Sequence, residues 1–255
     1  MSSWSVRRRL IYLLIVFLFF AVIFYSIYWI FLWHPASCSD NIQNQGELGV
    51  DCGGPCSRVC AVEVSPLIKD WARTFKVEGG KYDVAALIEN PNFNLGLKKL
   101  DYKFTLFDSE NVPITDKSGS VFVNARDKFV IFETGLDTGK RIPLKAIVEF
   151  SQDLTWTRVD PKANKPPIIV QNQVLTNGQM PRLVAELIND SVFDLSDIII
   201  TAVIYDSDNN AVAVSQTFVN GIQKGRSSDI FFTWPNPFLG DHQTFEIYPR
   251  VNLVR

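Results

Sequence analysis

The longest apolar stretch of the chain lies near its N-terminus and runs from Leu10 to Trp33, 24 residues without a charged side chain. Three arginines, residues 7–9, come directly before it. At about 1.5 Å of rise per helical residue, this stretch can cross a hydrocarbon layer of about 30 Å with some tilt. Backbone polar groups in lipid must bond to one another, so a single span has to be helical. The pattern predicts a transmembrane helix over residues 10–33.

Beyond residue 61 the pattern changes to short strand-length segments with turn signals between them. In the clearest of these segments, Leu100 to Phe107, apolar residues alternate with Asp101, Lys103 and Thr105. Such alternation is typical of an antiparallel sheet with one buried and one solvated face.

The strand pattern occurs twice along the chain. Residues 84–114 match residues 183–214, and further on residues 121–124 match residues 217–220. Matches in the same order at a nearly constant offset indicate a tandem duplication. Six or seven short strands in about 90 residues favour a sandwich of immunoglobulin or fibronectin type. We therefore predict an all-β fold of two tandem antiparallel β-sandwiches, together with one N-terminal transmembrane helix.

Polar residues recur at equivalent turns of the two copies. Asn90 matches Asn189, and Asp108 matches Asp206. Pro91 favours extended geometry at Asn90, and asparagine side chains can close a turn on their own backbone. We expect an architectural role for these residues.

Residues 160–167 are polar and rich in proline, which predicts an extended and fairly stiff linker. The predicted order is a cytoplasmic N-terminus at 1–9, the span at 10–33, a cysteine-rich stalk at 34–61, the first sandwich at 62–159, the linker at 160–167 and the second sandwich at 168–255.

The arginines before the span favour a cytoplasmic N-terminus and extracytoplasmic C-terminal domains in the cell membrane. A cleaved signal peptide is the alternative, because it also has a basic start and an apolar core. Such a core has about 7–15 residues and ends in small residues. This one is longer and ends in Tyr28, Trp29, Phe31 and Trp33, as in an aromatic interfacial belt. We expect a retained signal-anchor.

The four cysteines, Cys38, Cys52, Cys56 and Cys60, all follow the span closely. Outside the cytoplasm an even, clustered set predicts two disulfides, with three possible pairings. The stalk has few apolar residues, so cross-links must supply its order. Gly53 and Gly54 allow the tight reversal that the spacing of the cysteines requires.

Two metal sites in the stalk are alternatives to the disulfide interpretation. Zinc could bind four thiolates, although the spacing is not that of two CxxC pairs. Calcium could bind the hard oxygen ligands that the stalk offers, which are Asp40, Asn41, Glu47 and Asp51. We predict no metal and no cofactor.

The net charge of the chain outside the span argues against nucleic acid as a partner. Of 25 basic residues, three precede the span, which leaves 22 against 27 acidic residues and a net charge near −5 outside it. Nucleic acid requires clustered cations, so we expect no nucleic-acid binding.

Catalytic signals are weak. The two histidines, His34 and His242, are far apart in the sequence and have no evident catalytic partner. Residues 135–140 do not have the spacing of a P-loop, and residues 206–210 begin like a calcium loop but lack its Gly and Glu. Residues 189–191 form an N-glycosylation sequon. We expect no enzymatic activity and no catalytic residue.

One strand of the second copy suggests a binding surface. The register of the repeat places Ile198, Ile200, Ala202 and Ile204 on the buried face. Ile199, Val203 and Tyr205 then lie on a face that is polar in the first copy. Apolar residues there could contact a partner or the other domain. Coverage by the loops of the same domain is the alternative.

The stalk resembles a short disulfide motif of secreted and surface-anchored bacterial proteins, through Cys38, Gly46, Glu47 and the run Val50-Asp-Cys-Gly-Gly54. Three residues separate Cys56 from Cys60, where that motif has two.

The first copy, with Ile88-Glu-Asn-Pro-Asn92 before its alternating strand, resembles the water-stress late-embryogenesis-abundant sandwich. The second copy, with Val203-Ile-Tyr-Asp206 and Phe231-Phe-Thr-Trp234, is similar to bacterial FxLYD domains, although Val203 stands where that motif has Phe. The resemblance covers about 190 residues and implies non-enzymatic sandwich domains that are commonly membrane-anchored.

We expect a single-pass protein whose sandwiches bind or scaffold an envelope or surface protein. The alternative is protection of the envelope during desiccation, which the late-embryogenesis-abundant resemblance implies. The sequence predicts neither the ligand nor the oligomeric state.

Overall fold

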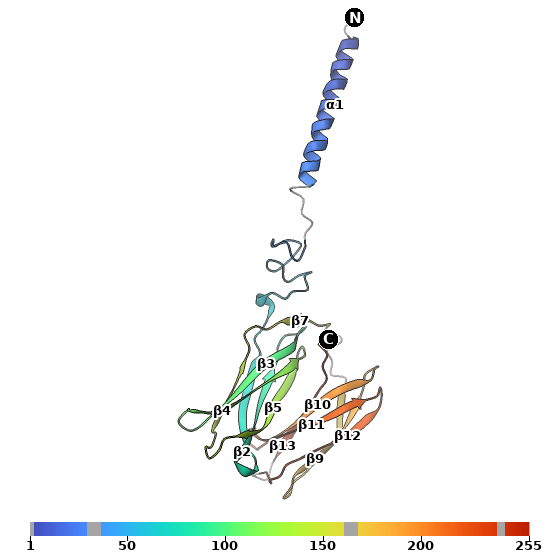
Figure 1. Cartoon of the computed structure of the whole chain (residues 1–255). Helices are drawn as coiled ribbons and strands as arrows, with labels where there is room; N and C mark the ends of the chain where they lie inside the picture. Colours follow the sequence, from blue (N-terminus) through green and yellow to red (C-terminus); the bar gives the residue numbers. More distant parts are fainter. Residues whose placement is uncertain (1–2, 30–36, 161–167, 239–242, 255) are drawn as a thin grey trace. The chain divides into compact units, whose positions relative to one another are not determined.

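The computed structural model describes residues 3–29, 37–160, 168–238 and 243–254. It divides into two compact units, Met1–Arg58 and Val59–Arg255. The first contains one helix and the stalk, and the second contains β-strands (Figure 1).

Helix α1 spans Ser3–Ile27, so it begins seven residues before the predicted span and includes the three arginines. Its portion Val6–Ile27 is long and apolar enough to cross a membrane, and none of its side chains is buried within the structure. Such exposure of an apolar helix fits contact with lipid. The last four residues of the predicted span, 30–33, lie outside the described residues.

Disulfides and short turns hold the stalk. Cys38 is bonded to Cys56 across 18 residues, one of the three pairings left open by the sequence. Cys52 and Cys60 are also disulfide-bonded. Gly53 and Gly54 have φ angles of +75° and +55°. A Cβ on Gly54 would lie 2.2 Å from a backbone oxygen, so this turn requires glycine, as the sequence predicts.

Two antiparallel sheets form the first sandwich (Figure 1). One has the order β1 (Ile68–Lys76), β2 (Lys81–Glu89), β5 (Lys128–Asp137). The other has the order β4 (Pro113–Val123), β3 (Leu95–Phe107), β6 (Lys145–Phe150), and β7 (Trp156–Arg158) also pairs with β3. Short 3₁₀ helices at Ala61–Glu63 and Glu78–Gly80 precede β1 and β2.

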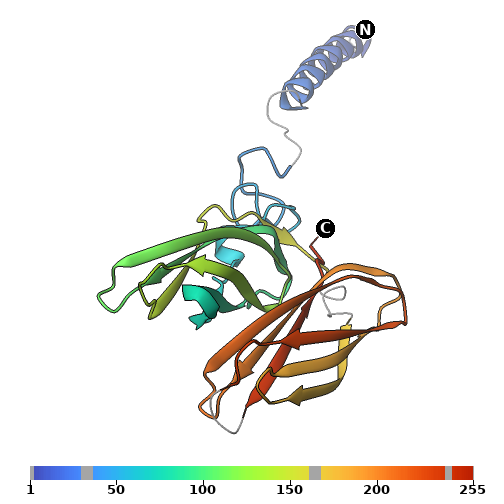
Figure 2. The same ribbon diagram turned by 60° about the horizontal axis from the view of Figure 1, so that its bottom comes forward.

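The second sandwich, coloured yellow to red in Figure 2, repeats the strand order of both sheets, but β7 has no counterpart there among the described strands. One sheet has the order β8 (Ile168–Thr176), β9 (Arg182–Asn189), β12 (Ser227–Thr233). The other has the order β11 (Ala211–Ile222), β10 (Leu195–Tyr205), β13 (Thr244–Arg250). The two tandem antiparallel sandwiches predicted from the sequence are therefore present, and their matching topology supports the duplication.

Each core lies between its two sheets, and strand alternation decides which side chains enter it. Leu100, Phe104 and Leu106 are completely buried in the first core. The equivalent faces of β10, with Ile198, Ile200, Ala202 and Ile204, are completely buried in the second. The inward faces predicted for both strands are confirmed.

The turns that follow β2 and β9 are built in the same way. The Asn90 amide donates hydrogen bonds to the carbonyl oxygens of Leu95 and Asn124, each at 2.8 Å. The Asn189 amide donates to the carbonyl oxygens of Phe193 at 2.8 Å and Ile222 at 2.9 Å. Both asparagines are fully buried, so their predicted architectural role is confirmed.

The two aspartate turns are also equivalent. Asp108 accepts backbone N–H bonds from Glu110 and Val112, and Asp206 accepts them from Asp208 and Asn210. These bonds are the largest cause of the lowered pKa of Asp206, whereas for Asp108 the largest cause of the lowered pKa is the bond from Arg141.

One part of the predicted repeat alignment is two residues out of register. Leu100 pairs with Val121, and its counterpart Ile198 pairs with Val219. Val121 therefore corresponds to Val219, and not to Thr217 as the local similarity suggested. A shift of two residues leaves the same side chains facing the core, so the alternation pattern alone does not reveal it and the pairing of the strands does.

Candidate functional site

An apolar cluster joins the two sandwiches. The outer face of sheet β1-β2-β5 contributes Ala85, Leu87 and Val130, and the outer face of sheet β11-β10-β13 contributes Val203, Tyr205, Ala211 and Val214. Val203 is completely buried and Tyr205 is 9% exposed, while Ile199 is half-buried. Of the suggested binding surface, Val203 and Tyr205 thus pack against the other domain and are closed to an outside partner, whereas Ile199 is not part of this cluster.

A buried ion pair lies at one end of this interface. Arg250, at the end of β13, donates from Nη2 and Nε to Asp127 Oδ2 of the first sandwich at 2.9 and 3.2 Å. It also donates to the Phe122 carbonyl oxygen at 2.6 Å. The guanidinium lies 4.3 Å from the ring of Phe122 and 4.0 Å from the ring of Phe129. Burial lowers the pKa of Arg250, and the charge of Asp127 opposes that shift.

The chain after Arg250 also contacts the first sandwich. The Asn124 amide donates to the Val251 carbonyl oxygen at 3.0 Å, and its oxygen accepts the Leu253 N–H at 2.9 Å. Val254 packs on Gly96 so closely that a Cβ there would lie 2.6 Å from it. The C-terminal segment therefore joins the second sandwich to the first.

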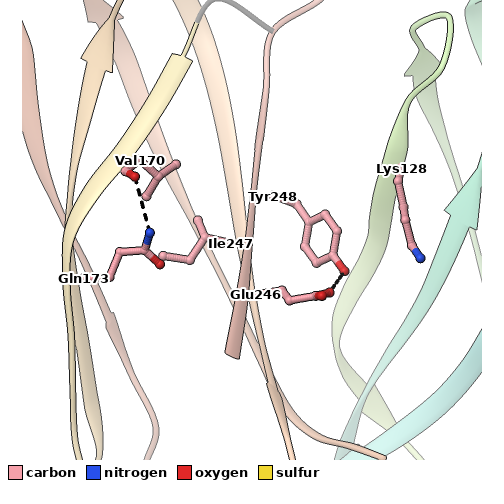
Figure 3. Close-up of a pocket in the computed structure, with 6 residues that line it drawn as sticks. All are labelled: Lys128, Val170, Gln173, Glu246, Ile247 and Tyr248. Carbon is pink, nitrogen blue, oxygen red and sulfur yellow. Dashed lines mark hydrogen bonds between the residues drawn. The ribbon is translucent and has the colours of Figure 1, made fainter. Parts of the chain in front are cut away.

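A polar hollow of about 370 Å³ lies beside the apolar cluster, between β5 and β13 (Figure 3). Tyr248 donates a hydrogen bond to Glu246, and the Tyr205 hydroxyl donates to the same carboxylate at 3.3 Å. Lys128 faces them from β5 and forms an ion pair with Asp70 at 2.9 Å.

The protonation states of the two tyrosines and the lysine in this hollow follow from their surroundings. Burial, and next the bond to Glu246, raise the pKa of Tyr248, and burial also raises the pKa of Tyr205. The bond to Asp70 raises the pKa of Lys128. Both phenols therefore stay protonated and the ammonium stays charged at neutral pH, which suits hydrogen bonding better than proton transfer.

Tyr205→Phe tests what this hydrogen-bond network contributes. The ring keeps its apolar contacts and the hydroxyl loses its weak bonds to Glu246 at 3.3 Å and Tyr248 at 3.4 Å, so we expect a loss of about 0.5–1.5 kcal/mol in the free energy of unfolding. Denaturant unfolding monitored by tryptophan fluorescence measures it. Tyr248→Phe removes the closer bond to Glu246 and should cost at least as much. A loss above about 3 kcal/mol for Tyr205→Phe would contradict this assignment.

A second, larger concavity opens between the sandwiches, with a volume of about 600 Å³. We call it the edge groove. Its lining comes from residues 74–77 of the first sandwich and residues 211–216 and 233–238 of the second, together with Asp83, Phe132 and Thr134. Apolar and aromatic side chains predominate, with Lys76 and Asp83 as charged exceptions. Burial raises the pKa of Asp83, which accepts the Gly135 N–H at 2.8 Å.

The predicted metal alternatives can be compared with the stalk geometry. Among the described residues, one group of potential ligand atoms comes together there, from Cys38, Glu47 and Cys56. The two sulfurs are bonded to each other and so cannot act as thiolate ligands. The Asp51 carboxylate instead accepts the Asn41 N–H at 3.1 Å, and Asp40 accepts the Ile42 N–H at 2.9 Å. These carboxylate oxygens accept backbone hydrogen bonds and so stabilise turns of the stalk.

Two further sequence candidates have structural roles. Asp206 closes the turn of the proposed calcium loop through its backbone bonds. The side chain of Asn189, the acceptor of the sequon, is buried and donates both of its N–H bonds, so it is closed to modification.

Sequence reasoning picked out Val203 and Tyr205 but missed other residues that build the interface and the edge groove, among them Asp127, Arg250, Trp234 and Phe238. The one available signal was Arg250 itself, a cation between apolar residues at the end of a strand. Its partner is 123 residues away, and no local pattern indicates it.

Comparisons with known proteins do not assign the chain to a family. Neither a family model nor a curated protein matches the sequence. A crystal structure of red sea bream transglutaminase is similar at 12% identity and a TM-score of 0.28. That match covers 75% of this chain and 30% of the transglutaminase chain, and at this TM-score it carries no argument. The late-embryogenesis-abundant and FxLYD resemblances therefore stay predictions.

Proposed function

We propose that the chain is a non-enzymatic, single-pass membrane protein that presents two joined β-sandwiches outside the cytoplasm to bind or scaffold an envelope or surface protein. The observation that carries the proposal is the sequence of elements in the N-terminal unit, where an apolar helix is followed by disulfide-bonded cysteines. Disulfides persist in oxidising compartments, and the arginines at the start of α1 favour a cytoplasmic N-terminus.

Binding is supported by the character of the edge groove. Ligand sites are concave and mostly apolar, with a few polar groups that fix orientation. The edge groove is likewise concave and mostly apolar. Its two charged residues, Lys76 and Asp83, both belong to the first sandwich. Because the Arg250 ion pair joins the sandwiches, the groove walls are held in a defined arrangement before a partner arrives.

Protease treatment of cells tests the topology. For a full chain with an epitope tag at each end, we expect external protease to remove the C-terminal tag from intact cells (spheroplasts if an outer layer excludes the protease). The N-terminal tag should be lost only after permeabilisation. A cytoplasmic marker protein controls for leakage. Survival of the C-terminal tag on intact, accessible cells would contradict the orientation.

Photo-cross-linking in cells tests binding at the edge groove. A benzophenone amino acid at Ser215, which lines the groove, should give a discrete cross-linked species. The same amino acid at Ser120, on the corresponding edge strand of the first sandwich, is the matched control. Equal products from both positions, or none from Ser215, would argue against the groove as the binding site.

A further inference from the structure

The edge groove runs along the backbone edge of strand β11. Residues 211–216 all line it, without a gap. Successive side chains of a strand point to opposite faces of the sheet, so a concavity lined by six consecutive residues must follow the edge of the strand and not one face. Among the described strands, β11 pairs with β10 alone, so it is an edge strand of its sheet. About 20 Å of unpaired strand edge therefore faces the groove.

This edge lacks the proline and the charged side chains that normally prevent strand pairing, and the duplicated sandwich provides the comparison. Phe107 pairs with Pro113 in the first sandwich, and Tyr205 pairs with Ala211 in the second, so residues 113–118 of β4 correspond to 211–216 of β11. The β4 segment is Pro-Ile-Thr-Asp-Lys-Ser, and the β11 segment is Ala-Val-Ala-Val-Ser-Gln. Proline and charges block edge pairing. The exposed edge of β4 has both, and β11 has neither.

The groove also continues an apolar interface that already exists within the molecule. Ala211 and Val214 belong both to the cluster between the sandwiches and to the groove lining, and Phe75 and Phe132 contact that cluster from the first sandwich. Trp234 and Phe238 add aromatic surface from the segment after β12. A side chain entering the groove would therefore extend apolar packing that already holds the two sandwiches together.

We propose that the edge groove receives an extended, uncharged segment of a partner protein, which pairs with β11 as an additional strand. The inference rests on the proposed binding function and names the chemical class of its partner. Main-chain hydrogen bonds to residues 211–216 would supply affinity, and alternate apolar or aromatic side chains of the segment would fill the groove. A segment of about six residues with β-branched and aromatic side chains at alternate positions fits these requirements.

Hydrogen exchange on the full chain in lipid nanodiscs tests this pairing. The probe is a synthetic peptide, acetyl-Lys-Thr-Val-Thr-Phe-Thr-Val-Thr-Lys-amide, whose lysines keep it soluble. At saturating peptide, we expect amide exchange in residues 211–216 to slow by about tenfold or more, while exchange in the matched β4 segment stays unchanged. A peptide N-methylated at every residue between its lysines, which keeps the side chains but has no N–H donor on either edge of that stretch, should give no protection.

In a second experiment, a lysine is placed on the edge strand of each sandwich, and binding of the same peptide is measured. Ser215→Lys places on β11 the residue that β4 has at the equivalent position, Lys117, and should weaken peptide binding about tenfold or more. Ser120→Lys makes the same change on β4 and should leave binding unaltered. Equal binding of the N-methylated peptide would overturn strand addition in favour of simple apolar contact. No protection by either peptide would overturn it as well. Either result would reject strand addition alone, because the cellular cross-linking and topology experiments test the proposed function separately.

Discussion

Replacing Arg250 with methionine is expected to lower the free energy of unfolding by about 3–5 kcal/mol, because removal of one partner leaves a buried charge uncompensated. Asp127 is its partner, and the side chains of Arg250 and Asp127 are only 3% and 15% exposed. The substitution keeps an apolar side chain of similar length against Phe122 and Phe129, so it removes charge and hydrogen bonds more than volume. Urea unfolding of the full chain in detergent micelles measures the loss.

The matched variants separate loss of the ion pair from a general effect of losing an arginine. Arg226 is exposed, and Arg226→Met should change stability by no more than about 0.5 kcal/mol. The double variant Arg250→Met, Asp127→Leu should recover at least half of the loss, because no charge is then left buried without its partner. If Arg250→Met costs less than about 1 kcal/mol, the ion pair does not hold the sandwiches together.

Asn90→Ala is expected to cost about 2–4 kcal/mol, because it leaves two buried carbonyl oxygens without their donors. These are the oxygens of Leu95, at the start of β3, and of Asn124, directly after β4. Asn189→Ala should cost a similar amount, since its amide donates to two carbonyl oxygens in the same way. Thermal and denaturant unfolding of both variants measures the losses.

Two further variants, one to aspartate and one at the surface, test whether the loss of stability in Asn90→Ala comes from the loss of its amide N–H donors. Asn90→Asp retains an oxygen that can accept the Asn92 N–H but loses both donors, so it should be at least as destabilising as alanine. Asn177 is exposed, and Asn177→Ala should have an effect within about 0.5 kcal/mol. A fully stable Asn90→Asp variant would mean that the two carbonyl oxygens find other donors.

Local patterns in the sequence predicted much of the architecture. Alternation identified the buried faces of β3 and β10, and the recurrence of Asn90 at Asn189 identified equivalent turns. These predictions succeed because strand periodicity and turn closure depend on residues close together in the chain. The apolar outer residues of β10, Val203 and Tyr205, were also recognised as a surface that something must cover.

The joined arrangement of the sandwiches could not be predicted in this way. Asp127 and Arg250 meet through the packing of two domains, and a charged residue on an isolated strand looks like any solvated side chain. The edge groove also depends on this packing, because its walls come from β1 and β11. The register of β11 was two residues out in the sequence comparison, which concealed the correspondence between its edge and that of β4.

The contact between the sandwiches is directional, because each sandwich contributes a different sheet to it. It uses the outer face of sheet β1-β2-β5, where Trp71, Leu87 and Val130 lie in one row across the strands. In the second sandwich the same row is Gln171, Glu186 and Asp229. A third domain stacked in the same manner would have to dehydrate two carboxylates, at a cost of several kcal/mol. This polar row therefore leaves the outer surface of the second sandwich hydrated and unsuited to the same kind of apolar contact.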